Sequence, residues 1–211
     1  MVALLCLECG TLRAQWFEWG VRDGANISSL VGIDNTTPLG GLYVGVATSF
    51  LFDERWGASL DATLSSQGTR CLENADGVST TYNYEYLNIP LMATYRIGLK
   101  DGSEVRFMAG PQLGLFLVGS VDYTAPSVLD GGYVQGSTML DSEDFHPMDF
   151  GISVGLQWLL GEQNKTAIEL RYTHGITQTH DGISNTLNGY YYISVPNNRN
   201  SVFQIGTVFY F

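Results

Sequence analysis

The stretch W-G-A-S-L-D-A-T-L-S-S-Q, residues 56–67, decides the fold class of this chain because two kinds of side chain alternate along it. One face of an extended strand would carry Trp56, Ala58, Leu60, Ala62 and Leu64. The other face would carry Gly57, Ser59, Asp61, Thr63, Ser65 and Gln67. Small and polar residues of the second kind cannot build an apolar core. We therefore expect the apolar face to contact lipid and the polar face to line the inside of a barrel.

The same alternation recurs elsewhere, most clearly over residues 148–158. The last segment, residues 201–211, ends on an aromatic residue, and we expect it to close the barrel because a closed barrel has no exposed edge strand. The mean hydropathy is +0.03, and no run of about 18 apolar residues suggests a transmembrane helix. The 25 Gly, 12 Tyr and 10 Phe suit strands with small residues inside and aromatic residues outside.

The sequence predicts one all-β domain over residues 16–211, an eight-stranded antiparallel transmembrane up-and-down β-barrel of the outer-membrane type. The strands are expected at residues 17–28, 41–52, 56–68, 84–97, 104–120, 147–160, 165–177 and 201–211. Tight turns at 53–55, 99–103 and 161–164 alternate with long loops at 69–83, 121–146 and 178–200. In bacterial outer-membrane barrels the short turns are periplasmic and the long loops are extracellular.

Residues 1–15 are expected to be an export signal peptide and not part of the barrel. A short apolar run, residues 1–7, precedes a candidate cleavage point after Ala14. No basic segment precedes this run, so we expect a longer signal to begin upstream. A disordered leader is the alternative. Cys6 and Cys9 would leave with the signal, which predicts that Cys71 has no disulfide partner.

Aromatic residues give an independent indication of orientation, since they gather near the turn-side ends of the predicted strands and on the outward face. These are Phe17, Trp19, Phe50, Phe52, Trp56, Tyr95, Phe107, Trp158, Phe209 and Phe211. Phe150, Tyr172 and Phe203 are the candidates on the opposite side. Aromatic girdles of this kind lie at the two membrane–water interfaces.

Four segments resemble the strand signatures of a known family. They are Y-L-N-I-P-L at 86–91, A-G-P-Q-L-G at 109–114, D-F-G at 149–151 and L-R-Y-T-H-G at 170–175. Together they resemble the outer-membrane β-barrel domain family, a porin-like group of small Gram-negative barrels that includes the PorT-type secretion accessory proteins. The resemblance implies the fold and the outer membrane as location. It leaves the activity open, since most members have none assigned.

Asp23 conflicts with the alternation of the first strand. By strict parity its carboxyl group would face lipid in the middle of the strand. We therefore expect a β-bulge near Gly24 that turns Asp23 inward or toward a lipid headgroup.

Nine charged residues, five acids and four arginines, fall on the inward face. They are Glu18, Arg22, Asp61, Arg96, Glu104, Arg106, Asp149, Glu169 and Arg171. An eight-stranded barrel has room inside for side chains but not for an open aqueous channel. Because an unpaired buried ion is very costly, we expect these charges to pair in one structural network that closes the lumen. A proton or ion path along the same groups is the alternative.

The net charge of −11 is concentrated in the predicted outer loops. The acids there are Asp34, Glu73, Asp76, Asp122, Asp130, Asp141, Glu143, Asp144 and Asp181, against only Arg70 and Arg199. Such loops would repel nucleic acid and attract cations or basic partners, or they simply form a solvated exterior. The trio at 141, 143 and 144 lacks the ligand spacing of a calcium loop, so we predict no metal site.

An enzymatic function finds little support. His146, His174 and His180 are candidate bases, and Ser201 lies near His174 on the same outward face. A Ser–His hydrolase also needs a group that orients the base, and no acid is evident on this face. The sequence shows no phosphate-binding Gly loop and no Cys–His zinc spacing. We therefore expect neither catalysis nor a cofactor.

These observations predict an integral outer-membrane protein with a plugged lumen that acts as a structural or interaction protein through long acidic extracellular loops. Its expected partners are outer-membrane lipid and envelope or extracellular proteins, and not nucleic acid. A narrow porin-like pore or an accessory subunit of an envelope secretion machine is the alternative. An enzyme that modifies outer-leaflet lipid is the third choice.

Overall fold

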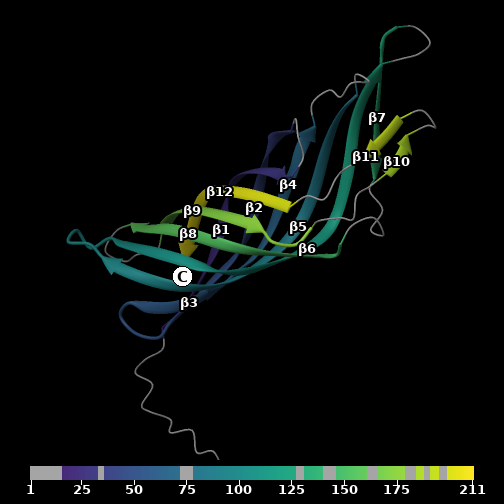
Figure 1. The fold of residues 1–211 in the computed structure, drawn as a ribbon. Coiled ribbons are helices and arrows are strands. Elements are labelled where there is room, and N and C mark those ends of the chain that lie inside the picture. Colours follow the sequence, from purple (N-terminus) through teal and green to yellow (C-terminus); the bar gives the residue numbers. More distant parts are fainter. Residues whose placement is uncertain are drawn as a thin grey trace, which may run out of the picture.

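The computed structural model describes residues 16–32, 36–71, 78–126, 131–139, 146–160, 166–178, 184–187, 191–194 and 199–211. The regular elements in these ranges are all strands (Figure 1). They are β1 (Trp16–Val31), β2 (Thr36–Leu51), β3 (Trp56–Leu60), β4 (Ala62–Cys71), β5 (Ser79–Gly98), β6 (Glu104–Pro126), β7 (Tyr133–Met139), β8 (Met148–Leu160), β9 (Thr166–Gly175), β10 (Ser184–Leu187), β11 (Tyr191–Ser194) and β12 (Arg199–Tyr210). In this part of the chain there is no helix with the length and apolar character needed to cross a membrane.

Eight strand units within the described residues close into one antiparallel ring. The order around the ring is β1, β2, β3/β4, β5, β6, β8, β9 and β12, where β3 and β4 are two parts of one unit. The last unit pairs back to the first, from Gly20 opposite Tyr210 to Val31 opposite Arg199. The predicted eight-stranded antiparallel barrel is therefore confirmed. Residues 1–15, predicted as a signal peptide, lie outside the described residues.

The third unit is interrupted at Asp61, where the sequence predicted one continuous strand over 56–68. Leu60 pairs with Leu91, and the ladder resumes only where Thr63 pairs with Asn88. Between these pairs the Asp61 N–H donates to the Pro90 carbonyl at 3.2 Å. Proline has no N–H to return the bond, so the ladder breaks here. The carboxyl group of Asp61 is buried inside the barrel.

Several strands run further toward the loop side than the apolar pattern predicted. β5 begins at Ser79 and β6 ends at Pro126, so parts of the predicted loops 69–83 and 121–146 belong to the sheet. β7 pairs with the far end of β6, and β10 pairs with β11 within the predicted loop 178–200. Figure 1 shows β5 and β6, together with β7, projecting beyond the other strands of the ring. The prediction ended each strand where its outward residues became polar, which marks the membrane boundary and not the end of the strand.

A β-bulge in β6 changes the facing of its upper part. Glu85 is opposite Val118, whereas the next residue, Tyr86, is opposite Phe116. The extra residue, Leu117, shifts the alternation, so Val121 is buried inside and Asp122 is exposed outside. Sequence periodicity alone could not reveal this change, because the residues alternate regularly both before and after the extra residue.

Two of the three tight turns are held by an aspartate. The Asp53 carboxylate accepts the N–H groups of Trp56 and Arg55, both at 2.7 Å, and these bonds lower the pKa of Asp53. The Asp101 carboxylate accepts the Ser103 hydroxyl at 2.6 Å and the Ser103 N–H at 3.1 Å, which lowers its pKa in the same way. Side-chain bonds of this kind favour tight turns over continued strand.

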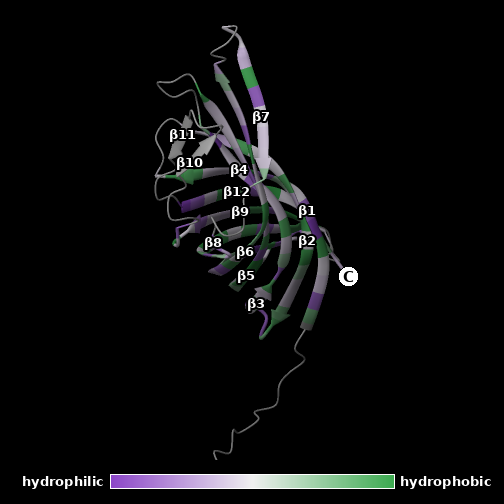
Figure 2. Ribbon diagram, turned by 90° about the vertical axis from the view of Figure 1, so that its right-hand side faces the viewer, coloured by the Kyte–Doolittle hydropathy of each residue, from purple (hydrophilic) through white to green (hydrophobic). Residues whose placement is uncertain are grey.

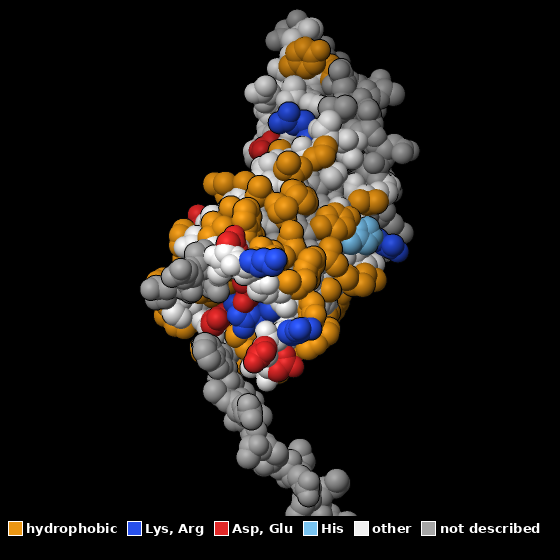
Figure 3. Space-filling model, turned by 90° about the vertical axis from the view of Figure 1, so that its left-hand side faces the viewer, with side chains coloured by type: hydrophobic (Ala, Val, Ile, Leu, Met, Phe, Trp, Pro, Cys, Tyr) orange, Lys and Arg blue, Asp and Glu red, His pale blue; other side chains and the backbone are white. Residues whose placement is uncertain are grey.

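In Figure 2 hydrophobic and hydrophilic residues are interspersed along the strands, and Figure 3 shows that the outer wall between the two ends is largely apolar. At the turn side, outward aromatic rings pair across neighbouring strands: Trp19 with Phe211 at 4.9 Å between centroids and Trp56 with Tyr95 at 4.8 Å. The predicted turn-side girdle is confirmed, since its members are outward and at least partly exposed. Figure 3 shows acidic and basic side chains gathered below this surface, at the turn end of the barrel.

The bulge expected near Gly24 is absent. β1 pairs without a register shift with both neighbours, and Asp23 is opposite Thr207 on one side and Val44 on the other. Asp23 is exposed on the outer wall, and the Thr207 hydroxyl donates to its carboxylate at 2.7 Å. The hydrogen bond to Thr207, and not a bulge, accommodates the carboxyl group. Asp23 lies four residues above the girdle residue Trp19, so it faces the apolar belt.

We expect the substitution Asp23→Leu to raise the free energy of unfolding by on the order of 1 kcal/mol, because it removes a carboxyl group from the lipid-facing wall. Urea-induced unfolding in lipid vesicles, followed by tryptophan fluorescence, measures the change. The control Thr207→Val removes the hydrogen bond but keeps the acid, and it should lower stability. A stability loss for Asp23→Leu would show that the acid contributes to the fold.

Side chains from β1 bridge a gap between β2 and β4. The ladder between these strands is irregular from Pro38 to Tyr43. Across the gap, the Asn26 amide donates to the Ser66 carbonyl at 2.9 Å, and the Ser28 hydroxyl donates to the Gly68 carbonyl at 3.0 Å. These bonds satisfy backbone groups that would otherwise lack partners inside the wall.

Candidate functional site

The candidate site is the interior of the barrel at its middle and its turn end. Of the nine charged residues predicted to face inward, seven are buried, and Glu18 and Arg96 are partly buried near the turn end. They come from β1, the β3/β4 break, β5, β6, β8 and β9. The alternation in each of these strands directs one side chain in two into the lumen, which is why charges distant in sequence meet there.

The middle of the lumen holds two arginines and two acids. The Arg22 guanidinium contacts Asp61 at 2.8 Å and also bonds Glu169. Arg171 contacts Asp61 at 2.7 Å and Glu169 at 3.2 Å. All four side chains are at most 3% exposed. We call these four residues the middle cluster, and its formal charges cancel.

A second group lies toward the turn end. Arg106 contacts Glu104 at 2.5 Å and Glu18 at 2.9 Å, and Arg96 bonds the other oxygen of Glu104. Arg96 and Glu104 are on adjacent strands and flank one turn, so this pair runs along the wall. We call Glu18, Arg96, Glu104 and Arg106 the lower cluster, and its formal charges also cancel.

Neutral side chains join the two clusters. The Arg106 guanidinium lies 5.2 Å from the centroid of the Tyr210 ring, a cation–π geometry. The Tyr210 hydroxyl donates to Gln157 at 3.0 Å, and the Gln157 amide donates to Glu169 at 2.6 Å. The connection between the clusters therefore runs through Tyr210 and Gln157 and contains no ion pair.

Glycines make room for the packing beside Arg22. Its guanidinium lies 5.1 Å from the centroid of the Tyr43 ring. A Cβ atom added to Gly206 would lie 2.2 Å from the Tyr43 hydroxyl oxygen, and one added to Gly24 would lie 2.7 Å from it. A larger residue at either position would displace Tyr43 from beneath the arginine.

Asp149 departs from the predicted network. Its carboxylate accepts the Thr177 hydroxyl at 2.7 Å, and among the described residues it makes no ion pair. The other eight charges form two neutral clusters of four, so Asp149 is the acid left over from the five-to-four excess. The prediction that Asp149 shares an arginine was wrong. Its position near the loop end of β8 keeps it away from the arginines, which lie lower in the barrel.

Both clusters cross the full width of the bore. The β3/β4 unit and β9 are four places apart in either direction around the ring, and Arg171 on β9 contacts Asp61 at the β3/β4 break. β1 and β6 are likewise four places apart, and Arg106 on β6 contacts Glu18 on β1. Ion pairs therefore connect opposite walls at two levels.

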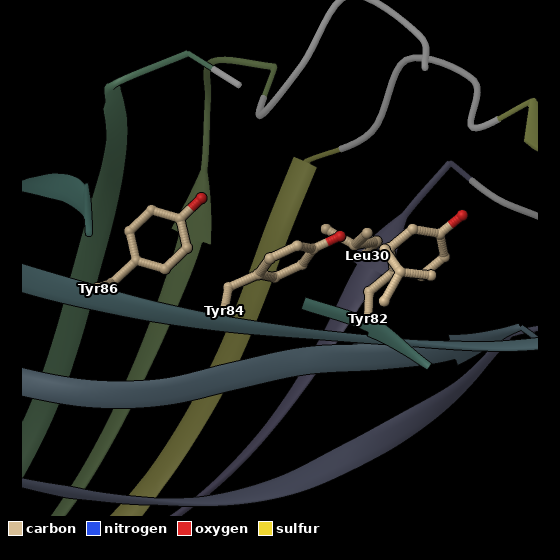
Figure 4. Close-up of a cluster of buried hydrophobic side chains, with 5 residues drawn as sticks. Leu30, Tyr82, Tyr84 and Tyr86 are labelled. Atoms are coloured by element: carbon tan, nitrogen blue, oxygen red, sulfur yellow. The ribbon is translucent and has the colours of Figure 1, made fainter. Parts of the chain in front are cut away.

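An aromatic cluster occupies the lumen on the loop side, and the sequence analysis missed it. Tyr82, Tyr84 and Tyr86 on β5 are buried together with Leu30 and Val121. Figure 4 shows the three tyrosine side chains in a row on one side of β5, with Leu30 close to Tyr82 and Tyr84. The available signal was the alternation of these tyrosines with Thr81, Asn83 and Glu85. The sequence analysis placed Tyr82 in the predicted loop 69–83, and it did not use the inward facing of Tyr84 and Tyr86 in the predicted strand 84–97.

Comparison with known proteins identifies the family. The family model described as outer membrane protein beta-barrel domain matches residues 13–181, which include seven of the eight wall units. The chain belongs to this family. It is therefore a protein of the bacterial outer membrane, as predicted, and its β-barrel is the family's domain.

Solved structures that are similar to this chain include outer-membrane proteins. Outer membrane protein OprG from Pseudomonas aeruginosa has a TM-score of 0.51 at 14% identity, over 93% of this chain and 97% of that one. Ail, the attachment invasion locus protein of Yersinia pestis, has a TM-score of 0.46 at 14% identity, over 92% and 99%. At this identity the similarity to OprG shows the fold alone. No curated protein matches the chain.

The predicted acidic loops fall almost entirely outside the described residues. Of the nine loop acids only Asp122 is described, and it lies on β6, where the Asn83 amide donates to it at 3.0 Å. The opposing residues Arg70 and Arg199 are described and exposed. The trio at 141, 143 and 144, considered for a divalent cation, also lies outside. Within the ranges that the structure covers, no three His, Cys, Asp or Glu side chains could hold a metal ion together.

The proposed hydrolase residues do not form a catalytic pair. The Ser201 hydroxyl donates to the Tyr172 hydroxyl at 3.1 Å, and that oxygen lies 3.4 Å from His174 Nδ1. Tyr172 therefore stands between the serine and the histidine, whereas a nucleophile must bond its base directly. His146 is exposed near the start of β8, and His180 lies outside the described residues. Cys71 is the last residue of β4 and not a loop residue.

Proposed function

We propose that this outer-membrane barrel has a lumen closed by its own side chains and acts as a structural or interaction protein through its extracellular side. The observation that carries this proposal is the pair of salt bridges between opposite walls, Arg171 with Asp61 and Arg106 with Glu18. Two levels of paired charge would leave an eight-stranded bore no width for solute flow. Function would then depend on the surface outside the membrane.

The extracellular extension supports this proposal. β6 continues past the last outward apolar residue, Val118, and with β5 and β7 it forms a sheet beyond the barrel rim. Tyr133 and Met139 on β7 are 69% and 72% exposed. Exposed apolar residues on a projecting sheet are typical of protein interaction surfaces. A partner with basic side chains would also complement the acidic loops.

We also propose that the protein has no catalytic activity. The support is the geometry around Ser201, whose hydroxyl bonds Tyr172 and not His174. Among the described residues the outer face of β9 and β12 carries no acid that could orient His174. A lipid hydrolase would need both contacts.

Site-specific photocrosslinking on intact cells tests the interaction function. A photoreactive residue at Gln135 on β7 samples the extracellular extension, and one at Glu54 in the 53–55 turn samples the periplasmic side; both positions are exposed. We expect a discrete protein adduct from position 135 and none from position 54. An adduct only from position 54 would favour a periplasmic machine. No adduct from either position would contradict an interaction function.

A further inference from the structure

The outer wall of β1, β12 and β9 changes character within one step. Ile27, Phe203 and Tyr172 lie side by side on these strands. One residue pair further toward the loops, Ser29, Ser201 and His174 form the next outward row. An apolar row is thus followed directly by a polar one. In the next outward row Arg199 lies opposite Val31, and both Val31 and Ile176 are exposed. Figure 3 shows one histidine next to a basic side chain and among hydrophobic side chains.

The height of this polar row fits the level of outer-leaflet headgroups. Ten residues of β1 separate the girdle residue Trp19 from Ser29. They span about 33 Å along the strand. Because strands of such barrels are tilted by about 40°, this length corresponds to a height of about 25 Å along the membrane normal. That value is the height of the apolar band of an outer-membrane barrel. The row of Ser29, Ser201 and His174 therefore lies where lipid headgroups begin.

Hydrogen bonds order the polar side chains at this level. Ser201 donates to the Tyr172 hydroxyl oxygen at 3.1 Å, and this oxygen lies 3.4 Å from His174 Nδ1. The two rings are also stacked, with centroids 6.4 Å apart and an interplanar angle of 26°. The tautomer of His174 sets the direction of this hydrogen bond. His174 Nε2 has no hydrogen-bond partner among the described groups, and it is a donor whenever it carries the proton.

The charge around this row is one-sided. Arg199 lies two residues beyond Ser201 on the same face, is exposed, and has no ion pair within the described ranges. The outward residues of β1, β9 and β12 from this row upward include no acid. On the opposite part of the rim, β5 and β6 present Glu85 and Asp122. An anionic headgroup is therefore attracted to β9 and β12 and repelled from β5 and β6.

We propose that Arg199 and His174, with the hydroxyl groups of Tyr172 and Ser201, bind the phosphate group of an outer-leaflet lipid. The arginine supplies charge and a planar pair of N–H donors, which suits phosphate oxygens. Nε2–H of His174 supplies a second donor, and Ile27 and Phe203 contact the lipid's upper acyl segment. This inference is independent of the closed lumen, because every residue in it lies on the outer wall.

Native mass spectrometry of the detergent-solubilised protein tests this site. The probe is phosphatidic acid, which carries a phosphate monoester, and diacylglycerol is the matched lipid without phosphate. We expect retention of phosphatidic acid and not of diacylglycerol. The substitution Arg199→Gln should weaken phosphatidic acid binding by about tenfold, as for one lost charge-assisted hydrogen bond. The substitution His174→Phe keeps a ring but removes the donor, and it should weaken binding to a smaller extent.

Arg70→Gln is the matched control, because Arg70 is an exposed rim arginine on β4, away from the proposed site. This variant should bind phosphatidic acid as the unmodified protein does. Equal weakening by Arg70→Gln and Arg199→Gln would overturn the site in favour of diffuse electrostatic attraction. Inorganic phosphate is the second arm. Displacement of the lipid by millimolar phosphate would show a site for free phosphate and overturn the lipid assignment, and no displacement supports it.

Discussion

The substitution Arg22→Met is expected to lower the free energy of unfolding by about 3–5 kcal/mol, the cost of leaving a buried charge without its partner. Arg22 is fully buried and bonds both Asp61 and Glu169. Without it, two acids would share the single positive charge of Arg171. Any water that enters the lumen would reduce the loss. Urea-induced unfolding in lipid vesicles measures the effect.

A second change separates charge balance from packing. In the Arg22→Met background, Glu169→Gln restores the neutrality of the middle cluster, and we expect it to recover part of the lost stability. The control Arg55→Met removes an exposed arginine in a turn and should change stability by less than about 0.5 kcal/mol. If Glu169→Gln destabilised the Arg22→Met protein further, the cluster would not be an electrostatic unit.

The substitution Ile152→Arg is expected to destabilise the barrel by about 2–4 kcal/mol, because it places a charge near the middle of the lipid-facing wall. Ile152 is 52% exposed on the outside of β8, between Trp158 and Met148. Leu60→Arg on β3 should act similarly, since Leu60 is 44% exposed on the same kind of surface. Unfolding in vesicles of defined thickness measures both.

Ser59→Arg is the matched control for facing direction. Ser59 is adjacent to Leu60 but lies inside the barrel and is 6% exposed. An arginine there meets polar surroundings and is opposed mainly by crowding. If Leu60→Arg were tolerated in the membrane and Ser59→Arg were not, the inside and outside of this strand would have been assigned in reverse.

Much of the wall could be predicted from side-chain alternation. Residues such as Leu60, Ile152 and Trp158 face outward as the period of two requires, because the membrane imposes one apolar face on every spanning strand. The inward facing of Arg22 and Arg171 follows from the same rule. In a strand without a bulge, facing direction is a local property of the extended chain, so it can be predicted from the sequence of that strand alone.

Contacts between distant strands could not be predicted in the same way. The acid that pairs with Arg106 depends on the shear of the barrel, because shear sets the height of each strand relative to the others. Side-chain periodicity within one strand gives no information about shear. The sequence therefore predicted that charges pair but placed Asp149 wrongly among them. The interruption at Asp61 depends on Pro90 in the neighbouring strand. The hydrogen bond that Thr207 donates to Asp23 joins the first and last strands of the ring, which are distant in the sequence.

The closed lumen is tested most directly by single-channel conductance in planar lipid bilayers. The protein is first shown to be inserted and folded by protection of its membrane strands from protease. With ion pairs that join opposite walls at two levels, we predict no steady conductance above the bilayer background, even at high applied voltage. A steady, reproducible conductance of porin size from the unmodified protein would contradict the closed lumen and would make a pore the function of this barrel.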